Sequence, residues 1–385
     1  MSIRFPTAWL SGPDTEAAGP MSGSVVGLLL GAIMLRDIRS LLGGIGSAGT
    51  AATVACFQFA VFTSFLSAAS AAPRWLSADV WVSDRGVESF DFPMPISEGY
   101  AGAVLADLPG ASVRRVVFGF TGWVSPAGRR GNVALIGVEE ADLAPRRFVA
   151  DRSDMRRLDI ARSDSESSIG ALTMASAAPT DGLATFLGAP YVVTGLDDAR
   201  AALAAPIDQV AFLAIDFPRG RPSDLDARLK RLKARYPELD VRTDAAFQAD
   251  SSRYWQTKTG AGAAILLAAI LASLLMILLM LTSIGRFIQR RSQDFVSLIG
   301  HGASDRQLAM LVGAVAAVLT GGAGLVALVA VPLARAVAAP MLPWVTLKPV
   351  DVVFALALVA ISFGLAVVAA IRALKRFPPH VIFRS

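Results

Sequence analysis

The chain has 385 residues, of which 54% are hydrophobic and only 17% are charged. This composition is too apolar for a soluble globular protein of this length and indicates a membrane protein. The formal net charge of +5 does not indicate a nucleic-acid-binding surface, because residues 74–258 carry 23 Lys and Arg against 25 Asp and Glu. The positive excess therefore lies in the remaining segments beside the apolar runs, where it is an orientation signal.

Four runs contain no Asp, Glu, Lys or Arg, and each is long enough for the roughly 20 apolar residues that a helix needs to cross a bilayer. The runs are residues 40–73, 259–285, 307–334 and 352–371, and a charged residue bounds each run on both sides. Within them we predict transmembrane helices at 43–67, 260–284, 308–333 and 352–371. The predicted fold class is an α-helical membrane protein with a 1+3 arrangement of spans and a mixed α/β extracytoplasmic domain, 73–258, between the first and the second.

Orientation follows from the arginines and lysines near the span ends, which accumulate on the cytoplasmic side. The loop 285–307 and the tail 372–385 carry four basic residues each, whereas the loop 334–351 carries two. Both termini are therefore predicted to be cytoplasmic, and 334–351 to be a short extracytoplasmic loop. Residues 1–42 are predicted to form a cytoplasmic N-terminus with an interfacial helix at 25–38.

The first run also allows an alternative interpretation as a cleaved secretory signal, since residues 68–72 are small. Signal peptides have an apolar core of about 7 to 15 residues, and this run is far longer, so an uncleaved span is favoured.

The segment 73–258 has the pattern of a mixed α/β domain. Strands are predicted at 79–83, 113–123, 133–138, 210–217 and 241–243, and helices at 96–108, 224–235 with Ser223 as N-cap, and 244–254. The polar stretch 145–185 resembles an insertion whose strands we cannot pair. The single cysteine, Cys56, lies in the first span, so the domain is predicted to fold without a disulfide.

The residues argue against most enzyme classes. The two histidines, His301 and His380, fall in predicted cytoplasmic segments, so the domain 73–258 has neither His nor Cys for a zinc site or for nucleophilic catalysis. No G-x-x-x-x-G-K-[ST] motif is present, and any ATP hydrolysis is expected from a partner. We therefore predict no enzyme activity, no cofactor and no metal. The uncharged spans also disfavour a proton or ion relay.

Small residues mark the first span. Gly43, Gly46 and Gly49 would let a second helix approach closely. Gln58 is the strongly polar side chain of this span, and a helix-to-helix hydrogen bond is a better explanation for it than a place in a transport pathway.

The loop 285–307 contains a second pattern. Phe295, Leu298 and Ile299 share one face of a short helix that Asp294 precedes and Gly300 ends. An exposed apolar patch on a short cytoplasmic helix suggests that a partner docks there. The alternative is a helix that rests on the bilayer surface.

From these motifs the chain resembles the FtsX-like or MacB-like permease family of ABC transporters. The most specific similarity is the segment with Asp294, Leu298, Gly300, Gly302 and Ala303, which looks like the family's coupling helix, although Ile299 stands where the family often has a basic residue. Residues 133–143 are similar to a strand and turn of the family's periplasmic domain, and residues 372–384 to its C-terminal tail. Residues 247–262 are most similar to the DevC subgroup.

The resemblance implies a permease subunit in the bacterial inner membrane that works as a homodimer with a separate cytoplasmic ABC ATPase. It implies that ATP-driven motion passes through the coupling helix to the periplasmic domain, without a polar pore through the spans. In the DevC-like subgroup a periplasmic adaptor, an outer-membrane duct and export of a lipid, glycolipid or other amphiphile are expected. The alternative within the family is an FtsX-type transmembrane regulator that activates extracytoplasmic cell-wall hydrolases.

Overall fold

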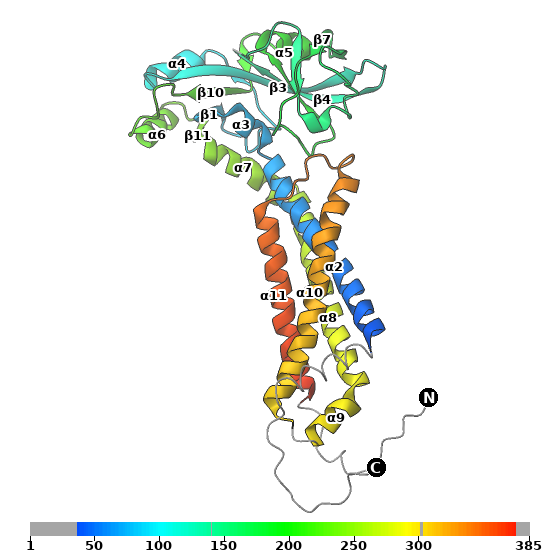
Figure 1. Cartoon of the computed structure of the whole chain (residues 1–385). Coiled ribbons are helices and arrows are strands. Elements are labelled where there is room, and N and C mark those ends of the chain that lie inside the picture. The colour runs from blue at the N-terminus through cyan, green and yellow to red at the C-terminus, as the bar shows by residue number, and fades with distance from the viewer. Residues whose placement is uncertain (1–36, 140, 301–302, 375–385) are drawn as a thin grey trace, which may run out of the picture. The chain divides into compact units, whose positions relative to one another are not determined.

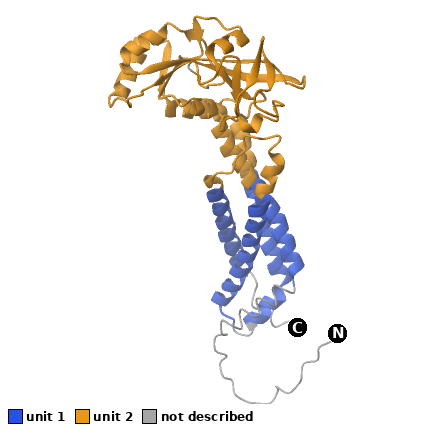
Figure 2. Cartoon of the chain, turned by 45° about the horizontal axis from the view of Figure 1, so that its top comes forward, with its two compact units in different colours: residues 1–55, 271–330, 352–385 blue, residues 56–270, 331–351 orange. Residues whose placement is uncertain are grey.

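The computed structural model describes residues 37–139, 141–300 and 303–374, and it divides into two compact units (Figure 2). We call the first the helical unit; it contains the chain up to Ala55, residues 271–330 and the chain from Val352. The second, the α/β unit, contains Cys56–Ile270 and Val331–Asp351. The interfacial helix expected at 25–38, apart from its last two residues, and the tail after 374 lie outside the described residues.

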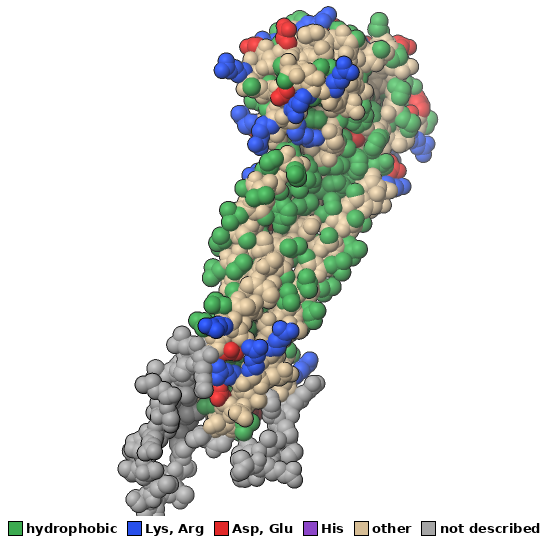
Figure 3. Space-filling model, turned by 90° about the vertical axis from the view of Figure 1, so that its right-hand side faces the viewer, with side chains coloured by type: hydrophobic (Ala, Val, Ile, Leu, Met, Phe, Trp, Pro, Cys, Tyr) green, Lys and Arg blue, Asp and Glu red, His purple; other side chains and the backbone are tan. Residues whose placement is uncertain are grey.

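Four long helices correspond to the predicted spans. They are α2 (Ile38–Ala68), α8 (Ala261–Arg290), α10 (Asp305–Ala338) and α11 (Pro349–Leu374). Within the described part of the chain, these four helices are long and apolar enough to cross a membrane, as judged by length and composition. Figure 3 shows hydrophobic side chains along their surface. All four extend a few residues beyond the spans, because a helix does not have to end where the apolar run ends.

The α/β unit contains a four-stranded antiparallel sheet in the order β11, β1, β10, β3 (Figure 1). The strands are β1 (Val80–Asp84), β3 (Ser112–Val124), β10 (Phe212–Asp216) and β11 (Leu239–Thr243). Helix α4 (Tyr100–Asp107) connects β1 to β3, and α6 (Leu225–Arg235) connects β10 to β11. This is a ferredoxin-like β-α-β-β-α-β topology with a long insertion between β3 and β10. A short ladder of β2 (Ile96–Ser97) and β9 (Gln209–Val210) flanks it.

The insertion builds a second set of strands on the far half of β3. It supplies β4 (Arg130–Val138), β5 (Arg147–Ala150), β6 (Glu166–Ile169), β7 (Leu172–Ser176) and β8 (Tyr191–Gly195), followed by α5 (Leu196–Leu203). The strand order β3, β4, β8, β5, β7, β6 returns to β3, since Trp123 pairs with Ile169 and Val124 with Ser168. The polar stretch 145–185, whose strands could not be paired from the sequence, thus provides β5, β6 and β7 of a closed ring.

Successive side chains of β4 point to opposite faces, so this one strand contributes to two cores. Val133 and Leu135 face the core inside the ring, whereas Ala134, Ile136 and Val138 face the opposite side. On that side, α3 (Ala71–Leu76) and α7 (Asp244–Thr257) cover the sheet. On the other face of the four-stranded sheet, α4 and α6 bury the alternate side chains of β1, β10 and β11. The two-residue period of a strand separates these cores.

Two local expectations require correction. The helix predicted over 96–108 divides into β2 and the shorter helix α4. The N-cap of α6 is Asp224 and not Ser223, because a backbone hydrogen bond from Leu225 to Pro222 (3.2 Å) closes a turn one residue later. The Asp224 side chain does not cap the helix but accepts a hydrogen bond from Arg228 Nε at 2.8 Å.

A buried carboxyl group lies at the edge of the ring. Asp154 ends a 3-10 turn (Arg152–Asp154) and is fully buried. Its Oδ1 accepts from Arg157 Nη1 at 2.7 Å, while Oδ2 has no hydrogen-bond partner among the described atoms. Burial raises the pKa of this carboxyl to about 6, against the opposing effect of the Arg157 charge. A proton on Oδ2 is favoured at a pH where an ordinary Asp has lost it.

The raised pKa of Asp154 makes the stability of the folded chain depend on pH. Between about pH 4 and about pH 6 the folded chain holds a proton on Asp154 that the unfolded chain releases, so stability falls as the pH rises through this window. The contribution is at most about 3 kcal/mol. Asp154→Asn should flatten this part of the profile, as measured by the unfolding temperature of the full chain across and on both sides of the window. The exposed Asp208→Asn is the control; equal slopes for wild type and Asp154→Asn would contradict the assignment.

Candidate functional site

The candidate site is the short helix α9 (Ser292–Gly300), which lies in the helical unit between α8 and α10. The backbone turns sharply at Arg291, whose N–H donates to Phe287 O and Ile288 O at 3.2 and 3.3 Å. The Arg291 guanidinium donates to Asp294 Oδ2 at 3.1 Å. Asp294 occupies the first turn, where a carboxylate is favoured by the exposed N–H groups of the helix end. This short helix is therefore tied to α8 by main-chain and side-chain bonds.

Phe295 anchors α9 in the helical unit. Its side chain is 1% exposed and lies in an apolar core with Ile284, Phe287 and Leu311. Leu298 and Ala303 are partly buried against the same core. The sequence predicted that Phe295, Leu298 and Ile299 form one exposed patch, and for Phe295 this is wrong. The turn at Arg291 rotates this face of α9 back toward α8 and α10.

The outward face of α9 carries different residues. Gln293 and Ser297 are exposed, and Ile299 lies at the edge of this face with 37% of its surface accessible. Gly300 ends the helix, and residues 301 and 302, which include Gly302 of the predicted coupling segment, lie outside the described residues. Sequence periodicity identified the helix but not which side of it faces inward.

The start of α10 is a capping box. Ser304 and Gln307 bond reciprocally: the Ser304 N–H donates to Gln307 Oε1 at 2.9 Å, and the Gln307 N–H donates to Ser304 Oγ at 3.4 Å. The Ala303 N–H donates to Leu298 O at 3.0 Å, which closes the end of α9. Hydrogen bonds therefore fix both the end of α9 and the start of α10.

The small residues predicted in the first span lie on different sides of α2. A Cβ at Gly49 would come within 2.7 Å of Val326 on α10. Gly43 and Gly46 are exposed, and a Cβ at either would have no neighbour within 4 Å. Gly44, which the sequence did not single out, is more enclosed, since a Cβ there would lie 3.1 Å from Leu319 and 3.2 Å from Ser283. Gln58 is half-buried and makes no hydrogen bond among the described residues.

An aromatic cluster inside the α/β unit joins four chain segments that are far apart in sequence. Phe65 lies near the end of α2. Its ring centroid is 4.5 Å from that of Phe186 and 6.4 Å from those of Trp255 and Trp344. The Trp255 Nε1–H donates to the buried carboxylate of Asp91 at 2.8 Å. Trp255 is therefore held by contacts within the α/β unit.

Polar contacts beside this cluster hold the 331–351 segment to α2. Thr63 Oγ1 donates to Asp351 Oδ1 at 2.8 Å, and Ser64 Oγ donates to Thr346 O at 2.9 Å. Lys348 Nζ donates to Thr63 O at 2.8 Å. The sequence carries little signal for these contacts, because a lysine in a short loop and hydroxyls inside an apolar run are both common.

No protein-family model and no curated protein matches the chain. Among solved structures, the periplasmic region of MacB from Actinobacillus actinomycetemcomitans is similar over 44% of this chain and 90% of that one, with 7% identity and a TM-score of 0.35. The extracellular domain of the noncanonic ABC-type transporter YknZ from Gram-positive bacteria is similar over 43% and 99%, with 7% identity and a TM-score of 0.32.

A domain of a protein described as a permease from Porphyromonas gingivalis is similar over 43% of this chain and 89% of that one, with 14% identity and a TM-score of 0.29. All three neighbours are therefore extracytoplasmic or permease-derived domains.

The anchor in α9 makes a prediction. Phe295→Ala removes a fully buried ring from the apolar core and should destabilise the helical unit by about 3 to 5 kcal/mol. The expected readout is a lower unfolding temperature of the detergent-solubilised chain. Ile299→Ala, at the exposed edge of the same helix, is the matched control and should change it little. An equal effect of the two substitutions would show that Phe295 is not the anchor.

Proposed function

We propose that this chain is the permease subunit of an ABC transporter of the FtsX-like or MacB-like family, within it most similar to the DevC subgroup. One observation carries the proposal: α9 is a short helix with one face anchored in the helical unit by Phe295 and with Gln293 and Ser297 exposed on the other. A helix built in this way can receive a push from a partner and pass it to the long helices. A helix that rests on the bilayer would instead expose its apolar face to lipid.

In this proposal a separate cytoplasmic ABC ATPase docks on the outward face of α9, around Ile299. Asp294, Leu298, Gly300, Gly302 and Ala303 complete the coupling segment. ATP-driven motion then reaches the extracytoplasmic domain through α2 and α8, since each of these continuous helices contributes residues to both units. Uncharged spans suit helices that move as rigid rods, because no buried charge has to be rehydrated or paired during the motion.

We propose a homodimer in the bacterial inner membrane, with both termini cytoplasmic. Gly43 and Gly46 support a second copy, because they are exposed on α2 and leave room for a close helix. A periplasmic adaptor and an outer-membrane duct would complete an export path for a lipid, glycolipid or other amphiphile. The extracytoplasmic domain, the spans and the cytoplasmic segments keep the boundaries predicted from the sequence.

Docking on α9 is testable by co-purification. Ile299→Asp places a charge on the outward edge of α9 and should reduce recovery of the ABC ATPase that co-purifies with the wild-type chain roughly tenfold, the factor for about 1.4 kcal/mol of binding free energy. Ile299→Leu keeps the apolar surface and should retain binding. Membrane insertion and unfolding temperature should be those of the wild type in both. Full ATPase recovery with correctly folded Ile299→Asp would remove α9 as the docking site.

Topology is tested by cysteine labelling in a Cys56→Ser background. Ala127→Cys, on the exposed β3–β4 turn, should react with an impermeant maleimide added from the periplasmic side. Gln293→Cys, on α9, should react only after the membrane is permeabilised. Labelling of both cysteines from the same side would be incompatible with the proposed orientation.

A further inference from the structure

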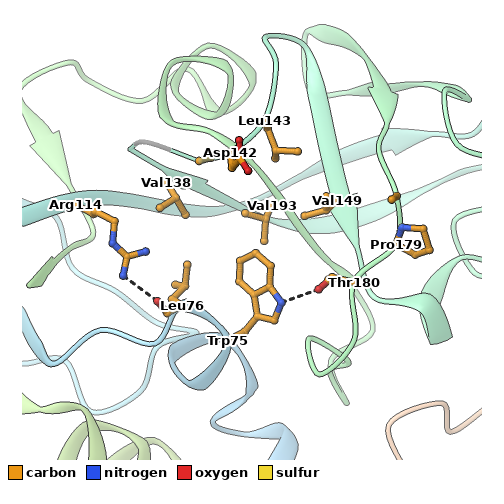
Figure 4. A pocket seen from close by; sticks show the side chains of 12 residues that line it. Trp75, Leu76, Arg114, Val138, Asp142, Leu143, Val149, Pro179, Thr180 and Val193 are labelled. Atoms are coloured by element: carbon orange, nitrogen blue, oxygen red, sulfur yellow. Dashed lines mark hydrogen bonds between the residues drawn. The ribbon is translucent and has the colours of Figure 1, made fainter. Parts of the chain in front are cut away.

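The α/β unit has a cavity of about 470 Å³ between α3 and the strands β4, β5 and β8 (Figure 4). This volume falls within the range of about 300 to 1,000 Å³ that is usual for small-molecule sites. All of its lining residues belong to the α/β unit. The coupling function proposed above does not use this cavity.

Apolar side chains form most of the wall. Val149 and Val193 are paired across β5 and β8, and Val138 lies on the same face from β4. The ring of Trp75, from α3, lies opposite these valines in Figure 4. Its Nε1–H donates to Thr180 Oγ1 at 2.9 Å, which fixes the orientation of the indole. The indole is therefore a fixed part of the cavity wall.

The charges at the cavity do not cancel. Arg114 is already neutralised, because its Nε donates to Asp216 Oδ2 at 2.7 Å and its Nη2 donates to Leu76 O at 2.9 Å. Asp142 lies across the cavity in the β4–β5 loop, is exposed, and makes no hydrogen bond or ion pair among the described residues. One carboxylate at the rim thus remains available for a ligand.

We propose that this cavity binds an apolar molecule that carries a protonated amine. The valines and Leu143 would hold the apolar part, and Asp142 would pair with the ammonium group. The indole of Trp75, on the opposite wall, would pack against the apolar part. An anionic ligand is disfavoured, because it would face Asp142 while Arg114 is already engaged. The site would hold cargo or a regulatory ligand of the proposed permease.

Decylamine, decanol and decanoate share one chain length and differ in the charge of the head group. Comparing them therefore separates the contribution of the head-group charge from that of the apolar chain. The reporter is Ala178→Cys in the Cys56→Ser full chain, because Ala178 lines the cavity and is exposed. The rate of its reaction with a charged maleimide is measured with each probe in lipid nanodiscs. Ala127→Cys, outside the cavity, reports any general effect of the probes on labelling.

Decylamine should slow labelling at position 178 at least roughly threefold more than decanol or decanoate, the size expected for one partly exposed ion pair. Asp142→Asn should abolish this preference, and Asp208→Asn should leave it intact. The proposal would be overturned if all three probes protected equally or if none protected. It would also be overturned if the preference for decylamine survived Asp142→Asn, or if labelling at Ala127→Cys slowed equally. Because no step involves the ATPase or transport, the proposed function and this site can fail independently.

Discussion

The α/β unit depends on a single strand, the 13-residue β3. Its first half pairs with β10 in the ferredoxin-like sheet, and its second half closes the ring by pairing with β6, while β4 pairs along most of its length. No disulfide supports the unit, since the chain has one cysteine. The backbone hydrogen bonds of β3 and the alternation of its side chains therefore hold two cores in one register, and a one-residue slip would turn both inside out.

The short helix α9 shows a comparable dependence on a few contacts. Alone in water it would be marginal, because nine residues cannot offset the cost of helix nucleation. The buried ring of Phe295 and the Arg291–Asp294 bond supply the missing stability. In the proposed coupling the same anchor would let α9 transmit force, since a surface that is fixed from behind does not yield when it is pushed. Stability and the proposed coupling thus rest on the same side chain.

Within the α/β unit, the end of α2 is joined to its neighbours by rings and hydroxyls and not by an extended sheet. Phe65, Phe186, Trp255 and Trp344 pack together, and Thr63 and Ser64 hold the 331–351 segment by hydrogen bonds. Contacts of this kind keep the end of α2 and the 331–351 segment in one body. The cavity near Trp75 lies in the same unit, so a ligand bound there would move with it as part of that body.

The sequence by itself determined the elements that depend on local composition. Uncharged runs located the four long helices, and the continuous apolar run from Val133 to Val138 located β4, because both signals come from neighbours in the chain. The α/β character and the short helix α9 were likewise readable from periodicity. The polar stretch 145–185 gave no such signal, since its strands are short and their alternate side chains are at least partly exposed.

Only the tertiary structure decided which surfaces meet. It closed the ring through Trp123 and Ile169, turned Phe295 inward, placed Gly49 rather than Gly46 against α10, and brought Asp142 and Trp75 to one cavity. These outcomes depend on contacts between residues distant in the chain, and a helical or strand period is equally compatible with several of them. The period shows that a face is apolar, but the partner that covers it is chosen by packing.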